Sequence, residues 1–224
     1  MGRLSDAASA LVQLLDFSPT DAEAWSELSD IYLSQGLYPQ AIYALEEVLV
    51  LAPNAWNVCS PTIAPDLSPM LMQRPSQIHA RLGELQYMAA TAPGVANGSL
   101  QKYLAEAIKR FSRSIELCDD YLRGYYGLKL VRRSSAITDT PADALQVSKK
   151  LLNDGVKAAK QTDDGDFVLP DTHTIERLNE LATAKLAEIV RHSAANDRGW
   201  RGYSEAEIAA ARELLADETS AIKR

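Results

Sequence analysis

The chain has 224 residues, 46% of them apolar, and a formal net charge of −7 with a pI near 5.0. It can therefore bury a real core, as one elongated domain or two short ones. The acidic balance argues against a nucleic-acid partner, because binding phosphate groups requires a basic face. No apolar run approaches the ~18 residues of a membrane span, and no secretion signal is recognisable.

The two cysteines, Cys59 and Cys118, are too few for a disulfide framework and lack the spacing of metal ligands. We expect each to be a small buried hydrophobe rather than a reactive thiol, in a reducing compartment such as the cytosol. The most basic stretch, residues 129–133, has three cations at the end of a predicted helix. A solvated helix end is the favoured interpretation of that stretch.

Residues 4–17 predict the first helix. They lie one period of 34 residues before the second helix of the unit that follows. They therefore look like the second helix of a preceding hairpin, whose first helix would lie before Met1. Either the N-terminus is shortened, which we favour, or something else covers this helix. The matched pairs are Ala7 with Ala41, Leu11 with Leu45, Leu14 with Val48, and Pro19 with Pro53.

Residues 20–53 predict a pair of antiparallel helices. Thr20 and Glu23 can form a capping box at the start, and Gly36 suits the left-handed position that ends the first helix. The pattern resembles the tetratricopeptide repeat, whose units stack into a protein-binding solenoid. We expect Trp25 to lie in the core. The signature positions are Trp25, Leu28, Tyr32, Gly36, Ala41, Leu45 and Pro53.

Residues 54–75 interrupt the pattern with closely spaced prolines, which remove hydrogen-bond donors and restrict their neighbours. We interpret this segment as an insertion loop. Leu67 with residues 70–72 could form a short docking segment, and a spacer packed loosely on the solenoid is the alternative.

Residues 76–160 predict two degenerate repeats. The first pairs a helix over 78–88, with Leu82 and Gly83 at signature positions, with a helix over 100–117 that contains Ala107 and Phe111. The second begins at Tyr121, has Tyr126 and Gly127 at the Leu-Gly place, and continues with a helix over 142–160.

The C-terminal part predicts two more helices. Apolar residues at steps of three and four predict a long helix that caps the solenoid. Ser204 and Glu207 form a second capping box before the last helix. Between the repeats and this cap, the acidic loop 163–166 fits a solvated turn better than a calcium site, because it lacks the distal Glu.

The sequence therefore predicts an all-α fold: a solenoid of antiparallel helix pairs with a C-terminal helical cap. Its predicted parts are a solenoid over 1–193 (partial repeat 4–19, repeat 20–53, insertion 54–75, degenerate repeats 76–160, capping helix 172–193) and a C-terminal helix and tail over 194–224.

Catalytic chemistry has no recognisable pattern in the chain. His79, His173 and His192 lie far apart, and no phosphate-binding loop or metal-ligand spacing is present. The adjacent acids Asp119 and Asp120 suit a turn. We therefore expect a protein that is not an enzyme and uses no cofactor and no metal.

A partner-binding face is expected on the first helices of the repeats, away from their core positions. This face is acidic or neutral, so it should repel acidic tails and prefer basic or apolar segments. A plain solvated face is the alternative. The candidate residues are Glu23, Ser26, Asp30, Leu33, Glu84 and Tyr87.

Three longer segments narrow the resemblance. The chain resembles subunit 2 of the endoplasmic-reticulum (ER) membrane protein complex in these segments, which are residues 24–33 with 40–49, residues 79–87 and residues 123–128. That resemblance implies a peripheral scaffold on the cytosolic face of the ER membrane. It would hold the cytosolic parts of membrane-embedded subunits and help insert tail-anchored and multipass proteins. The alternative is a free tetratricopeptide-repeat adaptor or cochaperone that binds a linear peptide.

Overall fold

The computed structural model describes residues 2–51, 75–93, 97–134, 170, 172–195 and 203–222. Within these ranges all regular structure is α-helical, so the predicted all-α fold of antiparallel helix pairs is confirmed. The chain divides into two compact units, Met1–Leu117 and Cys118–Arg224. The predicted boundary after residue 193 does not coincide with this division, because the last helix packs within the second unit.

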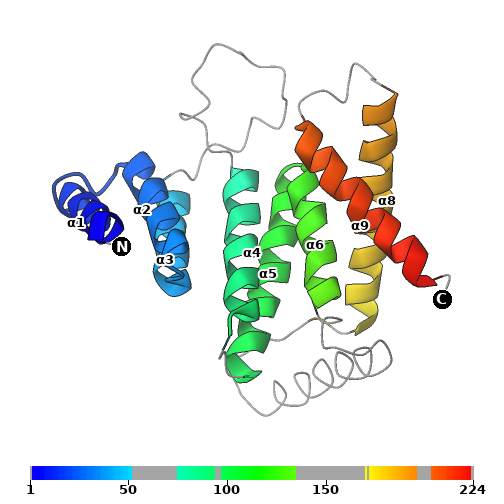
Figure 1. The fold of residues 1–224 in the computed structure, drawn as a ribbon, viewed down its shortest axis with the longest axis horizontal. Helices are drawn as coiled ribbons and strands as arrows, with labels where there is room; N and C mark the ends of the chain where they lie inside the picture. The colour runs from blue at the N-terminus through cyan, green and yellow to red at the C-terminus, as the bar shows by residue number, and fades with distance from the viewer. Residues whose placement is uncertain are drawn as a thin grey trace. The chain divides into compact units, whose positions relative to one another are not determined.

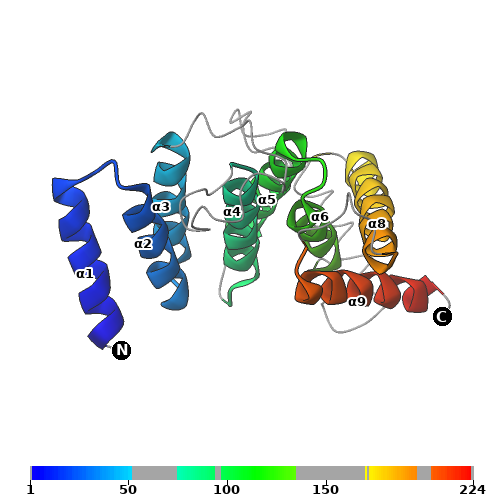
Figure 2. The same cartoon turned by 90° about the horizontal axis from the view of Figure 1, so that it is seen from above.

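Unit 1 has five helices among its described residues, and each packs on the next along the chain (Figures 1 and 2). They are α1 (Gly2–Phe17), α2 (Ala22–Ser34), α3 (Tyr38–Leu51), α4 (Pro75–Thr91) and α5 (Asn97–Leu117). In unit 2, α8 packs on α6, and α9 packs on both. Their bounds are Leu122–Ser134 for α6, Thr172–Ala194 for α8 and Glu205–Ile222 for α9.

Two apolar clusters hold α1 to α4 together. One contains Ala8, Leu15, Ala24 and Leu28 from α1 and α2. The other joins α3 to α4, and its buried members are Ala41, Leu45, Val48, Ile78, Leu82 and Leu85. Trp25 and Tyr32 are partly buried against both clusters. Among the signature positions, Leu28, Ala41 and Leu45 are buried members of these clusters, whereas Trp25, expected in the core, is only partly buried against them.

The turns around α2 follow from local hydrogen bonding. The N-cap is Asp21 and not the predicted Thr20: the Asp21 carboxylate accepts hydrogen bonds from the backbone N–H of Glu23 and Ala24. At the other end Gly36 has φ +74°, as predicted. The backbone N–H of Gly36 donates to the Leu33 carbonyl, and the N–H of Leu37 donates to the Tyr32 carbonyl. These two hydrogen bonds form the Schellman motif.

Small residues allow the paired helices to approach closely. Ser29 stands where the repeat signature has glycine, and its hydroxyl donates a 2.9 Å hydrogen bond to the Ala41 carbonyl. In the next pair, a Cβ on Gly83 would lie 2.8 Å from the Phe111 ring. Only glycine fits at that position without displacing Phe111, which is 1% exposed. Gly83 and Phe111, which the sequence places at two separate positions of this repeat, therefore meet between the paired helices.

Unit 2 buries one face of α8. Ala182, Leu186 and Ile189 are fully buried there, at the spacing of the predicted capping helix. Lys129 corrects a prediction, because it is 1% exposed instead of lying at a solvated helix end. Its ammonium donates a 2.7 Å hydrogen bond to the Thr183 hydroxyl, which in turn donates to the Asn179 carbonyl. Packing of α8 over α6 thus covers this lysine.

The start of α9 has the predicted capping box. The Ala206 N–H donates to the Ser204 hydroxyl, and the Ser204 N–H donates to the Glu207 carboxylate. Glu207 also pairs with Arg123 of α6 at 2.7 Å. The beginning of α9 is therefore fixed within unit 2 by polar contacts as well as by packing.

Several predictions concern residues outside the described ranges. They are Pro53, nearly all of the insertion 54–75, the helix over 142–160 and the acidic loop 163–166.

Cys118 corrects the expectation of a reduced thiol. It is buried, as predicted, but it is disulfide-bonded. Cys59, the other cysteine of the chain, lies outside the described residues. The expected reducing compartment therefore loses the support that free thiols would have given it.

The thiol content of the native protein tests this disulfide. We expect that denatured, unreduced protein will not react with a thiol label at Cys118, and that it will react after reduction. Full labelling before reduction would contradict the disulfide. A Cys118→Ser variant is the control, because it shows the labelling that Cys59 contributes alone.

Candidate partner-binding face

The outer stripe of α2 is the most exposed part of the predicted face. Glu23, Glu27, Asp30 and Ser34 follow one another at steps of four, three and four, so they share one side of the helix. All four are exposed. Glu23 and Asp30 were predicted for this face, whereas Glu27 was missed although its helical spacing places it between them.

Ser26 and Leu33 do not belong to this exposed stripe. Ser26 is 6% exposed, and Leu33 is partly buried against the cluster that joins α3 to α4. These two predicted residues turn toward neighbouring helices, because a step of three or four from a core position carries them to the edge of the core.

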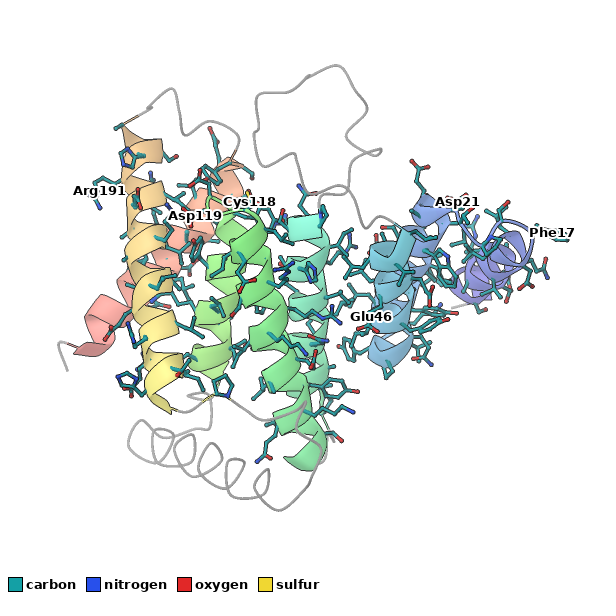
Figure 3. The ribbon with its side chains drawn as sticks, turned by 180° about the vertical axis from the view of Figure 1, so that it is seen from behind. Phe17, Asp21, Glu46, Cys118, Asp119 and Arg191 are labelled. Carbon is teal, nitrogen blue, oxygen red and sulfur yellow. The ribbon has the colours of Figure 1, made fainter. Side chains whose placement is uncertain are left out.

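An ion pair changes the charge of the face. Asp30 pairs with Arg81 of α4, and both side chains are substantially exposed. A second pair joins Glu46 of α3 to Arg110 of α5 at 2.6 Å, and Figure 3 labels Glu46 on its helix. The exposed Asp30–Arg81 pair adds little stability, but Arg81 neutralises one acid of the stripe. The remaining acidic charge is at Glu23 and Glu27.

The two candidates on α4 are only half-exposed. Glu84 and Tyr87 both lie between buried and exposed. They follow Arg81 by three and six residues, so Glu84 shares its side of the helix and Tyr87 is displaced from it. Of the predicted face, the structure therefore joins Asp30 to α4 through Arg81, and Glu84 lies on the same side of α4 as Arg81.

His79 lies on the same helix near two cations. Burial, with the charges of Arg110 and Arg113, lowers the pKa of His79 from 6.5 to about 4. The imidazole is thus neutral near pH 7, and its environment opposes protonation. The two arginines belong to α5, so His79 lies on the side of α4 that is close to α5.

A pH titration tests the state of His79. The unfolded chain takes up a proton below pH 6.5 and the folded chain does not, so the free energy of unfolding should fall as pH drops from about 7 to about 5. In His79→Gln that part of the pH dependence should disappear. Equal slopes for the two proteins, measured by urea unfolding, would contradict the lowered pKa.

A second polar cluster lies in unit 2 around Lys185. Its ammonium approaches Asp119 at 3.4 Å, Asp120 at 3.5 Å and Glu188 at 3.5 Å. Burial lowers the pKa of Lys185, but the three carboxylates outweigh it, so the pKa is raised. Asp119 and Asp120 form a turn, as predicted.

Two tyrosines complete the contacts of this turn. Tyr125 donates to Asp119, and Tyr203 donates a 2.6 Å hydrogen bond to the Asp120 carbonyl. Burial, followed by nearby acids, raises the pKa of Tyr203 to about 12. Together with Lys185 of α8, these contacts connect the turn at Asp119 and Asp120, just before α6, to α8 and to the start of α9.

Membrane-spanning helices and metal-binding clusters are both absent from the described residues. None of the helices there combines the length and the apolar character that crossing a membrane requires. In the same part of the chain, no three His, Cys, Asp or Glu side chains converge in a way that could hold a metal ion.

Comparison with known proteins agrees with the helix pairs. Residues 1–58 match the family model of the tetratricopeptide repeat. The match spans α1, α2 and α3. The "TPR repeat protein oca3" of Schizosaccharomyces pombe is 27% identical over 186 residues, which are 83% of this chain and 52% of that protein.

A second relative names a complex. The "ER membrane protein complex subunit 2" of Saccharomyces cerevisiae is 29% identical over 123 residues, covering 55% of this chain and 35% of that protein. This chain therefore spans about half the length of the first relative (52%) and about a third of the second (35%). The similarity supports a repeat protein of the scaffold or adaptor kind.

Proposed function

We propose that this chain is a non-catalytic scaffold subunit of the ER membrane protein complex. It would hold cytosolic parts of membrane-embedded subunits and so support insertion of tail-anchored and multipass proteins. The observation that carries the proposal is similarity to a protein named as subunit 2 of that complex, on a chain whose first 58 residues match the tetratricopeptide repeat. Association at the cytosolic face, as a peripheral protein without a cofactor, belongs to the same proposal.

The acidic stripe of α2 suits partner segments that are basic or apolar. Glu23 and Glu27 leave a negative field at one end of the face, while Arg81 offsets Asp30 in its middle. Electrostatic complementarity of this kind governs which partner associates and how fast. A chaperone tail rich in carboxylates would be repelled from this end.

Charge reversal tests the stripe. The double variant Glu23→Lys with Glu27→Lys should co-purify with less of the membrane subunits than the unchanged chain does. The loss should be larger at low salt, because salt then screens the charges less. The matched control is Glu176→Lys with Glu180→Lys, which reverses two exposed acids at the same spacing on α8. Equal recovery for both doubly substituted proteins would remove the stripe from the binding surface.

The second candidate is a free adaptor that binds a linear peptide. The similarity to a protein named as a TPR repeat protein supports this candidate. In this case the purified chain alone should bind a short basic peptide in a way that depends on Glu23 and Glu27. Migration of the native protein in a large detergent-extracted assembly, with no free pool, would instead favour the complex subunit.

A further inference from the structure

Trp25 of α2 and Tyr43 of α3 form an aromatic pair at the surface of unit 1. Their ring planes are 80° apart and their centroids 6.0 Å apart. The indole N–H donates a 2.9 Å hydrogen bond to the Pro19 carbonyl, which fixes the orientation of that ring. Tyr43 is 57% exposed, and in a T-shaped pair each ring keeps at least one face that the other does not cover. The pair therefore presents an oriented, electron-rich ring face to the solvent.

Glu47 adds a carboxylate beside the exposed ring. It follows Tyr43 by one helical turn on α3, and its hydrogen bonding and its charge raise the pKa of Tyr43. The neighbouring Glu46 pairs with Arg110, whereas Glu47 has no ion pair within the part of the chain that the structure describes. No cation balances the carboxylate of Glu47 there. We call Trp25, Tyr43 and Glu47 the aromatic corner.

The aromatic corner is separate from the acidic stripe of α2. Glu23 and Glu27 lie two positions before and after Trp25. A step of two residues turns an α-helix by about 200°, so Trp25 lies on the opposite side of α2 from these two acids. The corner and the stripe can therefore contact different segments, and substitutions at one leave the other in place.

We propose that the aromatic corner is a docking point for an arginine side chain of a partner protein. A cation above the face of a tyrosine or tryptophan ring is attracted by the negative charge of that face. The guanidinium is flat, so it stacks on a ring while the N–H groups at its edge donate to a carboxylate. Tyr43 supplies the ring and Glu47 the acceptor, one helical turn apart.

Other side chains fit the aromatic corner less well than arginine. A lysine ammonium is a compact and strongly hydrated charge, which cannot stack on a ring and bond a carboxylate with one rigid group. An apolar side chain would cover the Glu47 carboxylate without giving it a hydrogen-bond donor, which costs free energy. Charge complementarity therefore favours the guanidinium.

An NMR titration of the full chain with the blocked peptide Gly-Gly-Arg-Gly-Gly tests the aromatic corner. The chain has three tryptophans, each with its own indole N–H signal. We expect the signal of Trp25, assigned with Trp25→Phe, to move saturably, while Trp56 and Trp200 report any unspecific effect of the peptide. Citrulline has the shape of arginine without its charge, so the citrulline peptide should not bind. The lysine peptide should bind more weakly than the arginine peptide.

Substitutions on α3 separate the ring from the carboxylate. Tyr43→Leu and Glu47→Gln should each weaken binding of the arginine peptide about two- to fivefold, the size of one exposed cation–π contact or ion pair. Tyr43→Phe keeps the ring face and should retain binding. Glu27→Gln is the matched control, because it removes an acid from the opposite side of α2.

Three results would overturn the proposal. One is equal binding of the arginine and citrulline peptides, or of the arginine and lysine peptides. Another is loss of binding in Glu27→Gln but not in Glu47→Gln, which would assign the arginine to the acidic stripe. The third is a Trp25 signal that moves with the concentration of the chain alone, since a second copy would then occupy the corner. None of these readouts involves the membrane complex, so their failure is distinguishable from failure of the proposed function.

Discussion

Phe111→Ala is expected to lower the free energy of unfolding of unit 1 by about 3–5 kcal/mol, as for other buried phenylalanines. The side chain is 1% exposed, and its ring lies against the backbone of Gly83. Removing the ring empties the space between α4 and α5, which the rigid helices cannot close. Denaturant unfolding followed by circular dichroism measures the loss. A change below about 1 kcal/mol would show that the two helices do not pack through this contact.

Gly83→Ala provides the matching test from the other side of the contact. The added Cβ would lie 2.8 Å from the Phe111 ring, so we expect a loss of about 1–3 kcal/mol. Combined with Phe111→Ala, the same Cβ enters vacated space. The double variant should then be less destabilised than the sum of the single variants. Strict additivity would contradict the close approach of α4 and α5 at Gly83.

Trp25→Ala is expected to cost about 3 kcal/mol, at the lower end for a large aromatic residue because its side chain is only partly buried. The indole packs on both apolar clusters and donates a 2.9 Å hydrogen bond to the Pro19 carbonyl. The indole and the Tyr43 ring also form a T-shaped contact, with centroids 6.0 Å apart and an angle of 80° between the ring planes. Trp25→Ala thus loosens the contacts of α2 with α1 and with α3 together.

Two companion variants sharpen this prediction. Trp25→Phe keeps most of the packing and loses the hydrogen bond, so it should cost clearly less than Trp25→Ala. Tyr43→Ala removes the exposed partner of the ring contact and should have a small effect, since Tyr43 is 57% exposed. A shift of the thermal transition by only a degree for Trp25→Ala would show that Trp25 does not join the clusters.

The helix pairs of unit 1 could be predicted because local and periodic signals agree there. Gly36 has the left-handed conformation that its place after α2 requires. Ala41 and Leu45 are fully buried, as the repeat period indicates. The N-cap of α2 was predicted one residue too early, because Thr20 and Asp21 can both cap a helix. The structure shows that Asp21 accepts the hydrogen bonds.

The candidate face was predicted less well because it depends on contacts between distant parts of the chain. Arg81 pairs with Asp30 across 51 positions, the difference between the two residue numbers. Helical spacing alone places Ser26 near the exposed stripe, whereas packing of the neighbouring helices buries it. Lys129 is a similar case, since its burial depends on α8, which begins more than forty residues later.

Affinity purification of the tagged chain from detergent-solubilised membranes of its own host, followed by mass spectrometry, tests the central claim most directly. A scaffold subunit predicts recovery of one defined set of multipass membrane proteins, at constant ratios and across salt washes. An untagged extract and the variant Glu23→Lys with Glu27→Lys serve as controls. Recovery of the chain alone, from the fraction that contains no membranes, would contradict a scaffold subunit of a membrane complex.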